Sequence, residues 1–211
     1  MKALAAGACV LASAAVAGNA PGAFQSSVSR IPPDVRERVV GSSWRPDCPV
    51  PLRRLRLVRV SIHKFDDSKQ QARLIVHRTQ AHKIVRVFHK LWRADYPIRR
   101  MRLVDAYGAD DDRSMKADNT SAFNCRFVAG TSHWSMHAYG KAIDLNPVEN
   151  PYVGCGRVHD PSSAPYVDRS RRRKGMVTAA VVRAFRSIGW GWGGEWSGAT
   201  KDYMHFSTTG H

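Results

Sequence analysis

The feature that most constrains the fold of this chain is a pair of short segments, far apart in the sequence, whose side chains suit one metal ion. The first segment, residues 135–144, reads SMHAYGKAID, and the second, residues 202–205, reads DYMH. Together they offer two imidazoles and two carboxylates. A site that uses both segments requires the end of the chain to fold back onto its middle.

Zinc is the metal that these side chains suit. A catalytic zinc ion prefers three protein ligands and a water molecule, and neutral histidine with a carboxylate is a normal ligand set. His137, Asp144 and His205 supply that number. Asp202, three residues before His205, can lie beside the metal without binding it. A carboxylate there can accept a proton from an attacking water and pass it to a leaving amine.

The two segments together resemble the signature of the D-alanyl-D-alanine carboxypeptidases and L-alanyl-D-glutamate endopeptidases, a family of zinc metallopeptidases. The shared pattern is Ser-x-His-x-x-Gly-x-Ala-x-Asp, followed downstream by a carboxylate-x-x-His. The resemblance extends over about residues 55–206 and includes the Asn124-Cys125-Arg126 segment and the Gly- and Trp-rich segment 189–194.

This resemblance implies an α+β fold (hedgehog/DD-peptidase-like), with a small antiparallel sheet flanked by helices. It also implies zinc bound by His137, Asp144 and His205, with Asp202 as the general base. The implied reaction is hydrolysis of the stem peptides of bacterial peptidoglycan. Both cuts stay open: removal of a terminal D-alanine and cleavage within the stem peptide.

This chain departs from the family pattern at the position of the substrate-binding arginine. Many members place it directly after the strand that precedes the zinc motif, where this chain has Ala106-Tyr107-Gly108. We expect Arg126 to take this role, with Arg113 as the second choice, because a guanidinium fork suits a carboxylate or an oxyanion. A surface or structural role for Arg126 is the alternative.

Two further kinds of side chain are candidates for the site. Ser135 can donate a hydrogen bond near the metal, as groups around zinc ligands often do, or can shape a turn. Trp192 lies between Trp190 and Trp196 in a glycine-rich segment, and flat aromatic faces suit peptide and sugar surfaces. We expect at least one of these three tryptophans to pack in the core instead.

The N-terminal region predicts export. Residues 1–20 carry one lysine followed by a run of alanine, leucine, valine and glycine, as in a secretory signal peptide, with Ala15-Val16-Ala17 as the favoured cleavage site. An uncleaved anchor is the alternative. Residues 21–51 are rich in Ser, Pro, Gly and Arg without periodicity, which indicates a linker or a lightly ordered lead-in. We therefore expect one catalytic domain over residues 52–211, secreted or attached to the cell wall, monomeric, and without a transmembrane anchor after cleavage.

Hydrophobic periodicity predicts the main elements of this domain. We expect strands over residues 55–62 and 74–76 as a hairpin, a helix over 84–91, a strand over 101–104, a loop over 110–118, a helix over 176–188 capped by Gly189, and a last strand within 203–207.

The cysteines predict a disulfide. Three of the four remain if Cys9 leaves with the signal peptide, and an oxidising exterior favours pairing. We expect Cys125 to pair with Cys155, because they flank the first motif and a bridge between them would brace it. Reduced, buried thiols are the alternative.

The net charge of +16 indicates attraction to polyanions. Nucleic acid and the anionic polymers of a bacterial wall both qualify, and an exported protein meets the second. The sequence has no recognisable nucleic-acid motif, so we expect no specific nucleic-acid partner. The alternative to a peptidase is a non-catalytic, basic cell-wall-binding module with a structural zinc.

Overall fold

The computed structural model describes residues 23–158 and 160–211. The predicted signal peptide, residues 1–20, lies outside the described residues. The elements, in chain order, are β1 (Ser26–Ser29), α1 (Pro33–Val39), η1 (Leu52–Arg54), β2 (Leu55–His63), β3 (Lys69–His77), α2 (Ala81–Arg93), η2 (Val104–Tyr107), α3 (Asp111–Lys116), η3 (Met136–Tyr139), β4 (Ala142–Asp144), β5 (Tyr152–Gly154), β6 (Arg157–Val158), η4 (Pro161–Tyr166), α4 (Ala179–Arg186), β7 (Gly191–Trp192), η5 (Gly193–Glu195), β8 (Lys201–Asp202) and β9 (His205–Ser207).

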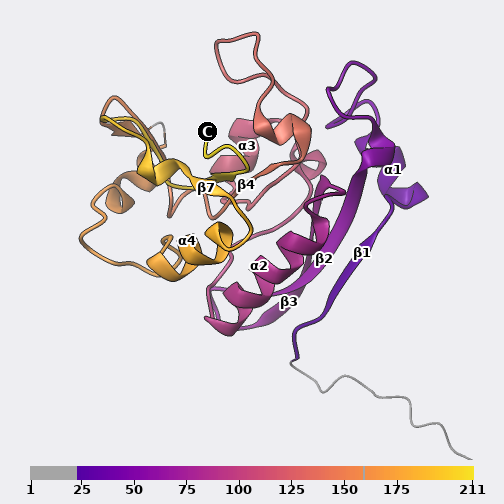
Figure 1. The fold of residues 1–211 in the computed structure, drawn as a ribbon. Helices are drawn as coiled ribbons and strands as arrows, with labels where there is room; N and C mark the ends of the chain where they lie inside the picture. The colour runs from indigo at the N-terminus through magenta and orange to yellow at the C-terminus, as the bar shows by residue number, and fades with distance from the viewer. Residues whose placement is uncertain (1–22, 159) are drawn as a thin grey trace, which may run out of the picture.

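The largest sheet joins β1, β2 and β3 in that order, all antiparallel (Figure 1). A turn stabilised by Asp66, whose carboxylate accepts the backbone N–H of Ser68 at 3.1 Å, connects β2 to β3. Alternate side chains of both strands face α2, as the period of a strand requires. Helix α2 buries Ile84, Val87 and Phe88 against that face. The predicted hairpin and helix are therefore confirmed.

The other strands form two smaller antiparallel sheets within the described residues. One has the order β4-β9-β7 and the other the order β6-β5-β8. Helix α4 packs Val181 and Phe185 into the same core as α2, so the core is continuous from the large sheet to the β4-β9-β7 sheet. Gly189, three residues past α4, adopts a φ of +83°, as a residue that ends a helix in the left-handed region does. The predicted α+β class is confirmed.

Two predicted elements were wrong. Residues 101–104 lie outside the strands, and Val104 begins the 3-10 helix η2. The aspartate-rich segment 110–118, expected as a loop, contains helix α3. Asp110 caps this helix by accepting the backbone N–H of Arg113 at 2.9 Å. The aspartates that suggested a loop are the residues that favour the start of a helix.

The described part of the expected lead-in, residues 23–51, is folded onto the domain. β1 adds a third strand to the large sheet, and α1 buries Val35 and Val39 against the sheet face opposite α2. Trp44 donates its indole N–H to the carbonyl of Val50 at 2.9 Å. This segment differs from a linker because most of its apolar side chains are packed: Phe24 and Val28 contact the main core, whereas Val35, Val39 and Val50 belong to a second buried cluster.

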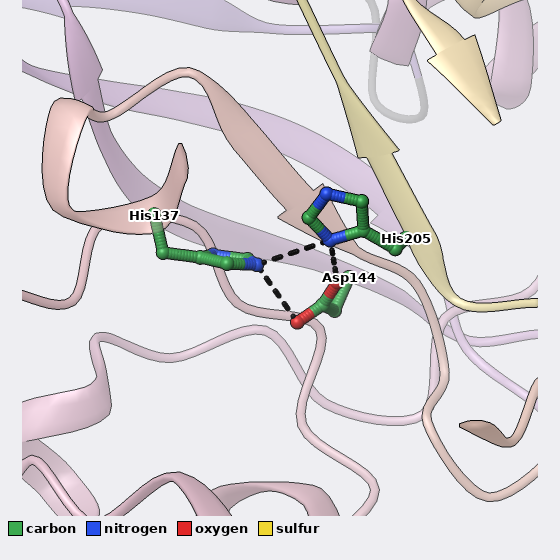
Figure 2. A group of neighbouring side chains, drawn as sticks. All are labelled: His137, Asp144 and His205. Carbon is green, nitrogen blue, oxygen red and sulfur yellow. Dashed lines mark hydrogen bonds and ion pairs between the residues drawn. The ribbon is translucent and has the colours of Figure 1, made fainter. Parts of the chain in front are cut away.

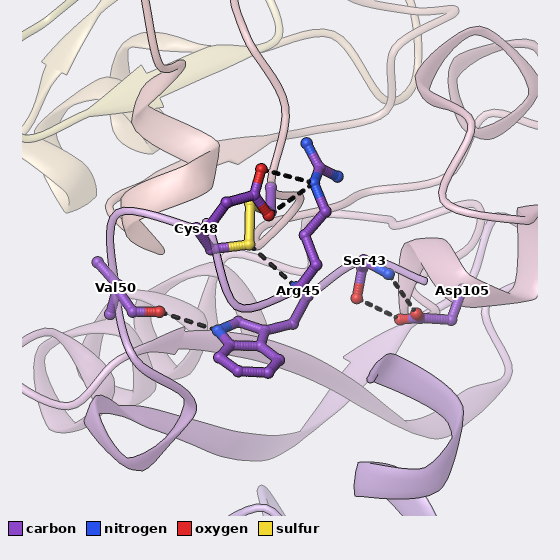
Figure 3. Close-up of a disulfide and its surroundings, with 8 residues drawn as sticks. Ser43, Arg45, Cys48, Val50 and Asp105 are labelled. Atoms are coloured by element: carbon purple, nitrogen blue, oxygen red, sulfur yellow. Dashed lines mark hydrogen bonds and ion pairs between the residues drawn. A yellow bond between two sulfur atoms is a disulfide. The ribbon is translucent and has the colours of Figure 1, made fainter. Parts of the chain in front are cut away.

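The disulfide joins Cys48 to Cys125, so the expected pairing of Cys125 with Cys155 was wrong (Figure 3). The backbone N–H of Cys125 donates to the carbonyl of Ser43 at 3.0 Å, which brings the two chain segments together. Cys155 is exposed in the turn between β5 and β6. The disulfide therefore ties the lead-in to the segment just before the first motif.

Among the helices of the described residues, none combines the length and the apolar character that a membrane crossing requires.

We predict that Cys48→Ser lowers the free energy of unfolding by about 2–4 kcal/mol, because the bond closes a long loop and restricts the unfolded chain. The two cysteines are 77 residues apart in sequence. Urea denaturation under oxidising conditions measures the change. Cys155→Ser is the matched control, because this thiol is exposed and unbridged, and we expect it to leave stability within about 0.5 kcal/mol. Equal losses in both variants would contradict the role of the disulfide.

Candidate metal centre and catalytic cavity

His137 is positioned by a short 3-10 turn. Ser135 precedes η3, and its hydroxyl accepts the backbone N–H of His137 at 3.3 Å. Gly140 ends the turn with a φ of +62°. A Cβ at this position would lie 2.6 Å from the backbone nitrogen of His77, so only glycine fits this crossing of η3 over the end of β3. The turn directs the buried His137 ring toward the start of β9.

Strand pairing brings Asp144 and His205 together. β4 and β9 are antiparallel, with Asp144 directly opposite His205 and Ile143 directly opposite Phe206. Ile143 and Phe206 belong to the main core. Because successive side chains alternate across a strand, the neighbouring Asp144 and His205 turn to the other face. The pairing of β4 with β9 therefore brings the two predicted segments, residues 135–144 and 202–205, together.

His137, Asp144 and His205, which we call the cluster, converge on one point (Figure 2). His137 Nε2 lies 3.0 Å from Asp144 Oδ2, and His205 Nδ1 lies 3.0 Å from Asp144 Oδ1. The two ring nitrogens are 3.4 Å apart. All three residues are buried.

The tautomer of His137 makes the cluster a cation site. His137 Nδ1 donates to the carbonyl oxygen of Ala122, which can only accept, so in the neutral ring Nε2 carries a lone pair. That lone pair faces a carboxylate oxygen of Asp144. Two acceptors at this distance repel each other unless a proton or a metal cation lies between them.

The charges within the cluster lower the pKa of Asp144 and raise that of His205. Burial would raise the pKa of Asp144, but His137 and His205 outweigh it and hold the pKa far below its usual range. Burial would lower the pKa of His205, but its hydrogen bond to Asp144 and the negative charges of Asp144 and Asp202 together outweigh burial and raise the pKa. The carboxylate is therefore negatively charged and available to a cation.

The spacing of the cluster fits zinc. Bonds of about 2.0–2.1 Å to nitrogen and oxygen in a tetrahedral site place ligand atoms about 3.3 Å apart. The three distances in the cluster, 3.0, 3.0 and 3.4 Å, lie near this value. His137 Nε2, Asp144 and His205 Nδ1 are the atoms that would hold the ion.

Asp202 lies in the same cavity as the cluster. It is the last residue of β8, which pairs with β5 so that Asp202 is opposite Tyr152. Its Oδ1 is buried and has no hydrogen-bond partner among the described residues. Burial, with the nearby charge of Asp144, raises its pKa to about 7 although His205 opposes the shift. A carboxylate with this pKa can both accept and return a proton near neutral pH.

The cluster and Asp202 line a cavity of about 750 Å³, which we call the cluster cavity. This volume lies within the usual range for a small-ligand site. Its other walls come from α3, from the segment before η3, and from the segments on both sides of β5. They include Asp111, Asp112, Met115, Lys116, Arg126, Trp134, Ser135, Met136, Val148, Tyr152, Trp196 and Met204.

Of the two arginines proposed to bind substrate, only Arg126 lines this cavity. Its Nη2 lies 2.7 Å from Asp111 Oδ2, and the side chain is half-buried. Arg113 is exposed on α3 and pairs with Asp110 at 3.5 Å. Arg126 is therefore the arginine that the fold places near the cluster, with its orientation set by Asp111.

The tryptophans divide between the core and the cavity. Trp190 is buried and donates to Gln80 at 3.2 Å. Trp192 packs against Phe206 and donates to the carbonyl of Tyr203 at 2.8 Å, so its ring belongs to the core side of β9. Trp196, and not Trp192, lines the cavity. The centre of its ring lies 6.5 Å from the centre of the His205 ring.

A buried ionic network holds the loop after β4, which contributes Val148 to the cavity wall. Arg99 donates to Glu149 Oε1 at 2.8 Å and to Asp118 Oδ2 at 3.2 Å, and Asp118 Oδ1 accepts the backbone N–H of Val148 at 3.0 Å. Glu149 is 1% exposed. Burial, together with nearby Asp118, raises the pKa of Glu149 to about 8 although Arg99 opposes the shift.

Sequence reasoning missed three contributors to this site. Asp111 was assigned to a loop, and nothing in its spacing links it to Arg126. The carbonyl of Ala122 sets the tautomer of His137 and leaves no signal in the side-chain sequence. Gly193 allows η5 to approach β8, since a Cβ there would lie 2.5 Å from the backbone oxygen of Asp202. That glycine lies in the Gly- and Trp-rich segment, which is the signal that could have identified it.

Comparison with known proteins agrees with this geometry. Residues 129–208 match the family model described as D-alanyl-D-alanine carboxypeptidase. The matched segment contains the whole cluster and Asp202, and it confirms the resemblance that the two motifs suggest. It identifies this part of the chain as that of a peptidase. No curated protein and no solved structure matches the chain.

We predict that the purified protein holds about one zinc ion per chain, and that His137→Ala or His205→Ala removes most of it, because each change leaves two ligands. Metal analysis after gel filtration measures the content. His133→Ala is the matched control, since His133 is exposed in the segment just before η3 and lies outside the cluster. Zinc loss in the His133 variant alone, or unchanged zinc in the cluster variants, would contradict this assignment.

We also predict that Glu149 makes the folded state less stable as pH rises. Its pKa in the folded state, about 8, lies above the usual 4.5, so folding favours the protonated form and that contribution is lost between these two values. Between pH 5 and 9, the free energy of unfolding of the wild type should fall by about 1–3 kcal/mol more than that of Glu149→Gln. Urea titrations across this range test it. Glu37→Gln, an exposed change on α1, should follow the wild type.

Proposed function

We propose that the protein is a zinc-dependent peptidase that hydrolyses the stem peptides of peptidoglycan, because residues 129–208 match the family model described as D-alanyl-D-alanine carboxypeptidase. The cut is either removal of a terminal D-alanine or cleavage within the stem peptide. The observation that carries the proposal is the convergence of three metal-binding atoms and the buried carboxylate of Asp202 in one cavity.

The arrangement of the cavity favours a catalytic zinc site over a structural one. Structural zinc sites are closed by four protein ligands, whereas catalytic sites use three and leave a position for water or substrate. Among the described residues, three groups form the cluster, and they line a cavity large enough for a peptide fragment. Asp202 contributes a carboxylate that is not part of the cluster.

Each residue then has a distinct task. His137, Asp144 and His205 would hold zinc, which when bound would act as a Lewis acid toward the peptide carbonyl and lower the pKa of water. Asp202 takes the proton from the attacking water onto its carboxylate and gives it to the amine that leaves when the peptide bond breaks. Burial, which raises the pKa of Asp202, favours its acceptance of this proton.

Arg126 and Ser135 are proposed to contact the substrate. Asp111 fixes the orientation of the Arg126 guanidinium, whose other N–H groups can donate to a carboxylate or to the carbonyl oxygen of the peptide bond. Ser135 is buried at the cavity wall and holds η3 through the backbone of His137. Trp196 supplies a flat apolar surface for the peptide backbone.

We further propose that the protein acts outside the cell, at the cell wall. The disulfide between Cys48 and Cys125 supports this location, because such bonds persist in oxidising compartments. The net charge of +16 favours contact with an anionic wall.

We predict that the zinc-loaded protein releases either one alanine or a larger fragment from soluble muropeptides, as measured by mass spectrometry of the products. Asp202→Asn should keep the zinc and lower kcat/KM by about 100- to 10,000-fold, because the amide cannot accept the proton. Zinc content of the same preparation, measured by metal analysis, separates loss of proton transfer from loss of metal.

Asp112→Asn is the control for this variant, because it removes one negative charge from the same cavity at an exposed position outside the cluster. We expect it to change kcat/KM by less than about threefold. A zinc-loaded wild type that binds wall fragments and releases no amine would instead identify a non-catalytic wall-binding module.

A further inference from the structure

A second cavity, of about 670 Å³, lies over the large sheet and shares no lining residue with the cluster cavity. Four arginines line it: Arg38 from α1, Arg59 from β2, Arg73 from β3, and Arg102 from the segment before η2. We call it the arginine cavity. The side chains of Val58, Val60 and Leu74 pack toward α2, so Arg59 and Arg73 lie on the opposite face of the sheet.

This cavity has an excess of positive charge, with four arginines against one carboxylate, Asp105. Arg59 and Arg73 are directly opposite each other across the β2–β3 pair, and like charges in that position destabilise a sheet. Within residues 23–158 and 160–211, none of the four guanidinium groups forms an ion pair with a carboxylate. The carboxylate that lines the cavity, Asp105, already accepts the backbone N–H and the hydroxyl of Ser43 at 3.1 and 2.9 Å (Figure 3).

We propose that the arginine cavity binds the phosphate groups of an anionic polyol-phosphate polymer of the cell wall. Guanidinium groups bind phosphate oxygens through two parallel hydrogen bonds, and a bound phosphate would remove the repulsion between Arg59 and Arg73. The choice of a wall polymer rests on the proposed function, whereas the binding of phosphate rests on the arginines alone.

The lining of the cavity favours a polymer without bases. Sites for single-stranded nucleic acid combine basic groups with aromatic side chains on which bases stack. The described residues that line the arginine cavity include no phenylalanine, tyrosine, tryptophan or histidine. Besides the arginines, they include the amides of Gln70 and Gln71, which suit the hydroxyl groups of a polyol.

The arginine cavity lies apart from the cluster cavity, so binding to the wall polymer and peptide hydrolysis would use different parts of the surface. Because the two cavities share no residue, a polymer in the arginine cavity leaves the cluster cavity open to a peptide. Attachment through phosphate would keep the enzyme at the wall and would weaken as salt concentration rises.

The test compares two double variants of the full chain that remove the same charge. Arg59→Gln/Arg73→Gln changes the arginine cavity, and Arg172→Gln/Arg183→Gln changes two exposed arginines that line neither cavity. The probe is purified poly(glycerol phosphate), with binding measured by calorimetry at low and moderate salt. We expect Kd to rise about tenfold or more in the cavity variant and less than about threefold in the control.

A third variant, Arg59→Lys/Arg73→Lys, keeps the charge and removes the guanidinium fork. We expect its Kd to lie between those of the wild type and of the glutamine variant. The thermal midpoint of each variant, measured without polymer, confirms that it folds. We expect the glutamine variant to be at least as stable as the wild type, because the opposed charges are gone.

Equal losses of affinity in the glutamine variant and the control would overturn the proposal, because binding would then follow total charge. Single-stranded DNA of matched charge that binds as tightly, with the same dependence on Arg59 and Arg73, would overturn the choice of polymer. Hydrolysis of soluble muropeptides should be unchanged in the glutamine variant. A wild type that binds the polymer and leaves muropeptides intact would refute the peptidase proposal and leave this one standing.

Discussion

The pairing of β4 with β9 is the interaction on which the site depends. It sets Asp144 opposite His205, and it sets Ile143 opposite Phe206 one position earlier. The apolar pair anchors both strands in the main core, and alternation along the strands then turns the two polar side chains to the cavity. A shift of one residue in this register would bury the ligands in the core and expose the apolar pair. The core therefore determines where the metal-binding atoms lie.

The sequence predicted the parts of the structure that depend on local pattern and on the two motifs. The hairpin of β2 and β3 and the helix α2 follow from alternation and helical spacing, and the structure confirms them. The cluster was predicted because His137, Asp144 and His205 lie in two motifs that together resemble a known signature and supply the ligands of one ion. Chemistry of this kind is visible without knowledge of the fold.

The disulfide pairing and the Asp111–Arg126 contact depend on which distant segments of the chain lie together. Local sequence patterns do not indicate such contacts. Cys48 and Cys125 meet because the folded lead-in passes the segment before the first motif, which made the choice of Cys155 wrong. Asp111 reaches Arg126 because α3 begins at that aspartate. The cap Asp110 and the first-turn residues Asp111 and Asp112 looked like a loop, because helix starts and turns favour the same residues.

The buried charges explain why the site needs support from two sides. Asp144, His137 and His205 are all buried, and burying charged groups costs free energy unless they are paired. In the neutral ring, the lone pair of His137 faces the carboxylate, so packing around the cluster contributes to its geometry. The disulfide and the hydrophobic packing of α1 hold the chain before the first motif, and the network of Arg99, Glu149 and Asp118 holds the loop after β4. A cation bound between Asp144 and the two rings would supply the positive charge that this buried cluster needs.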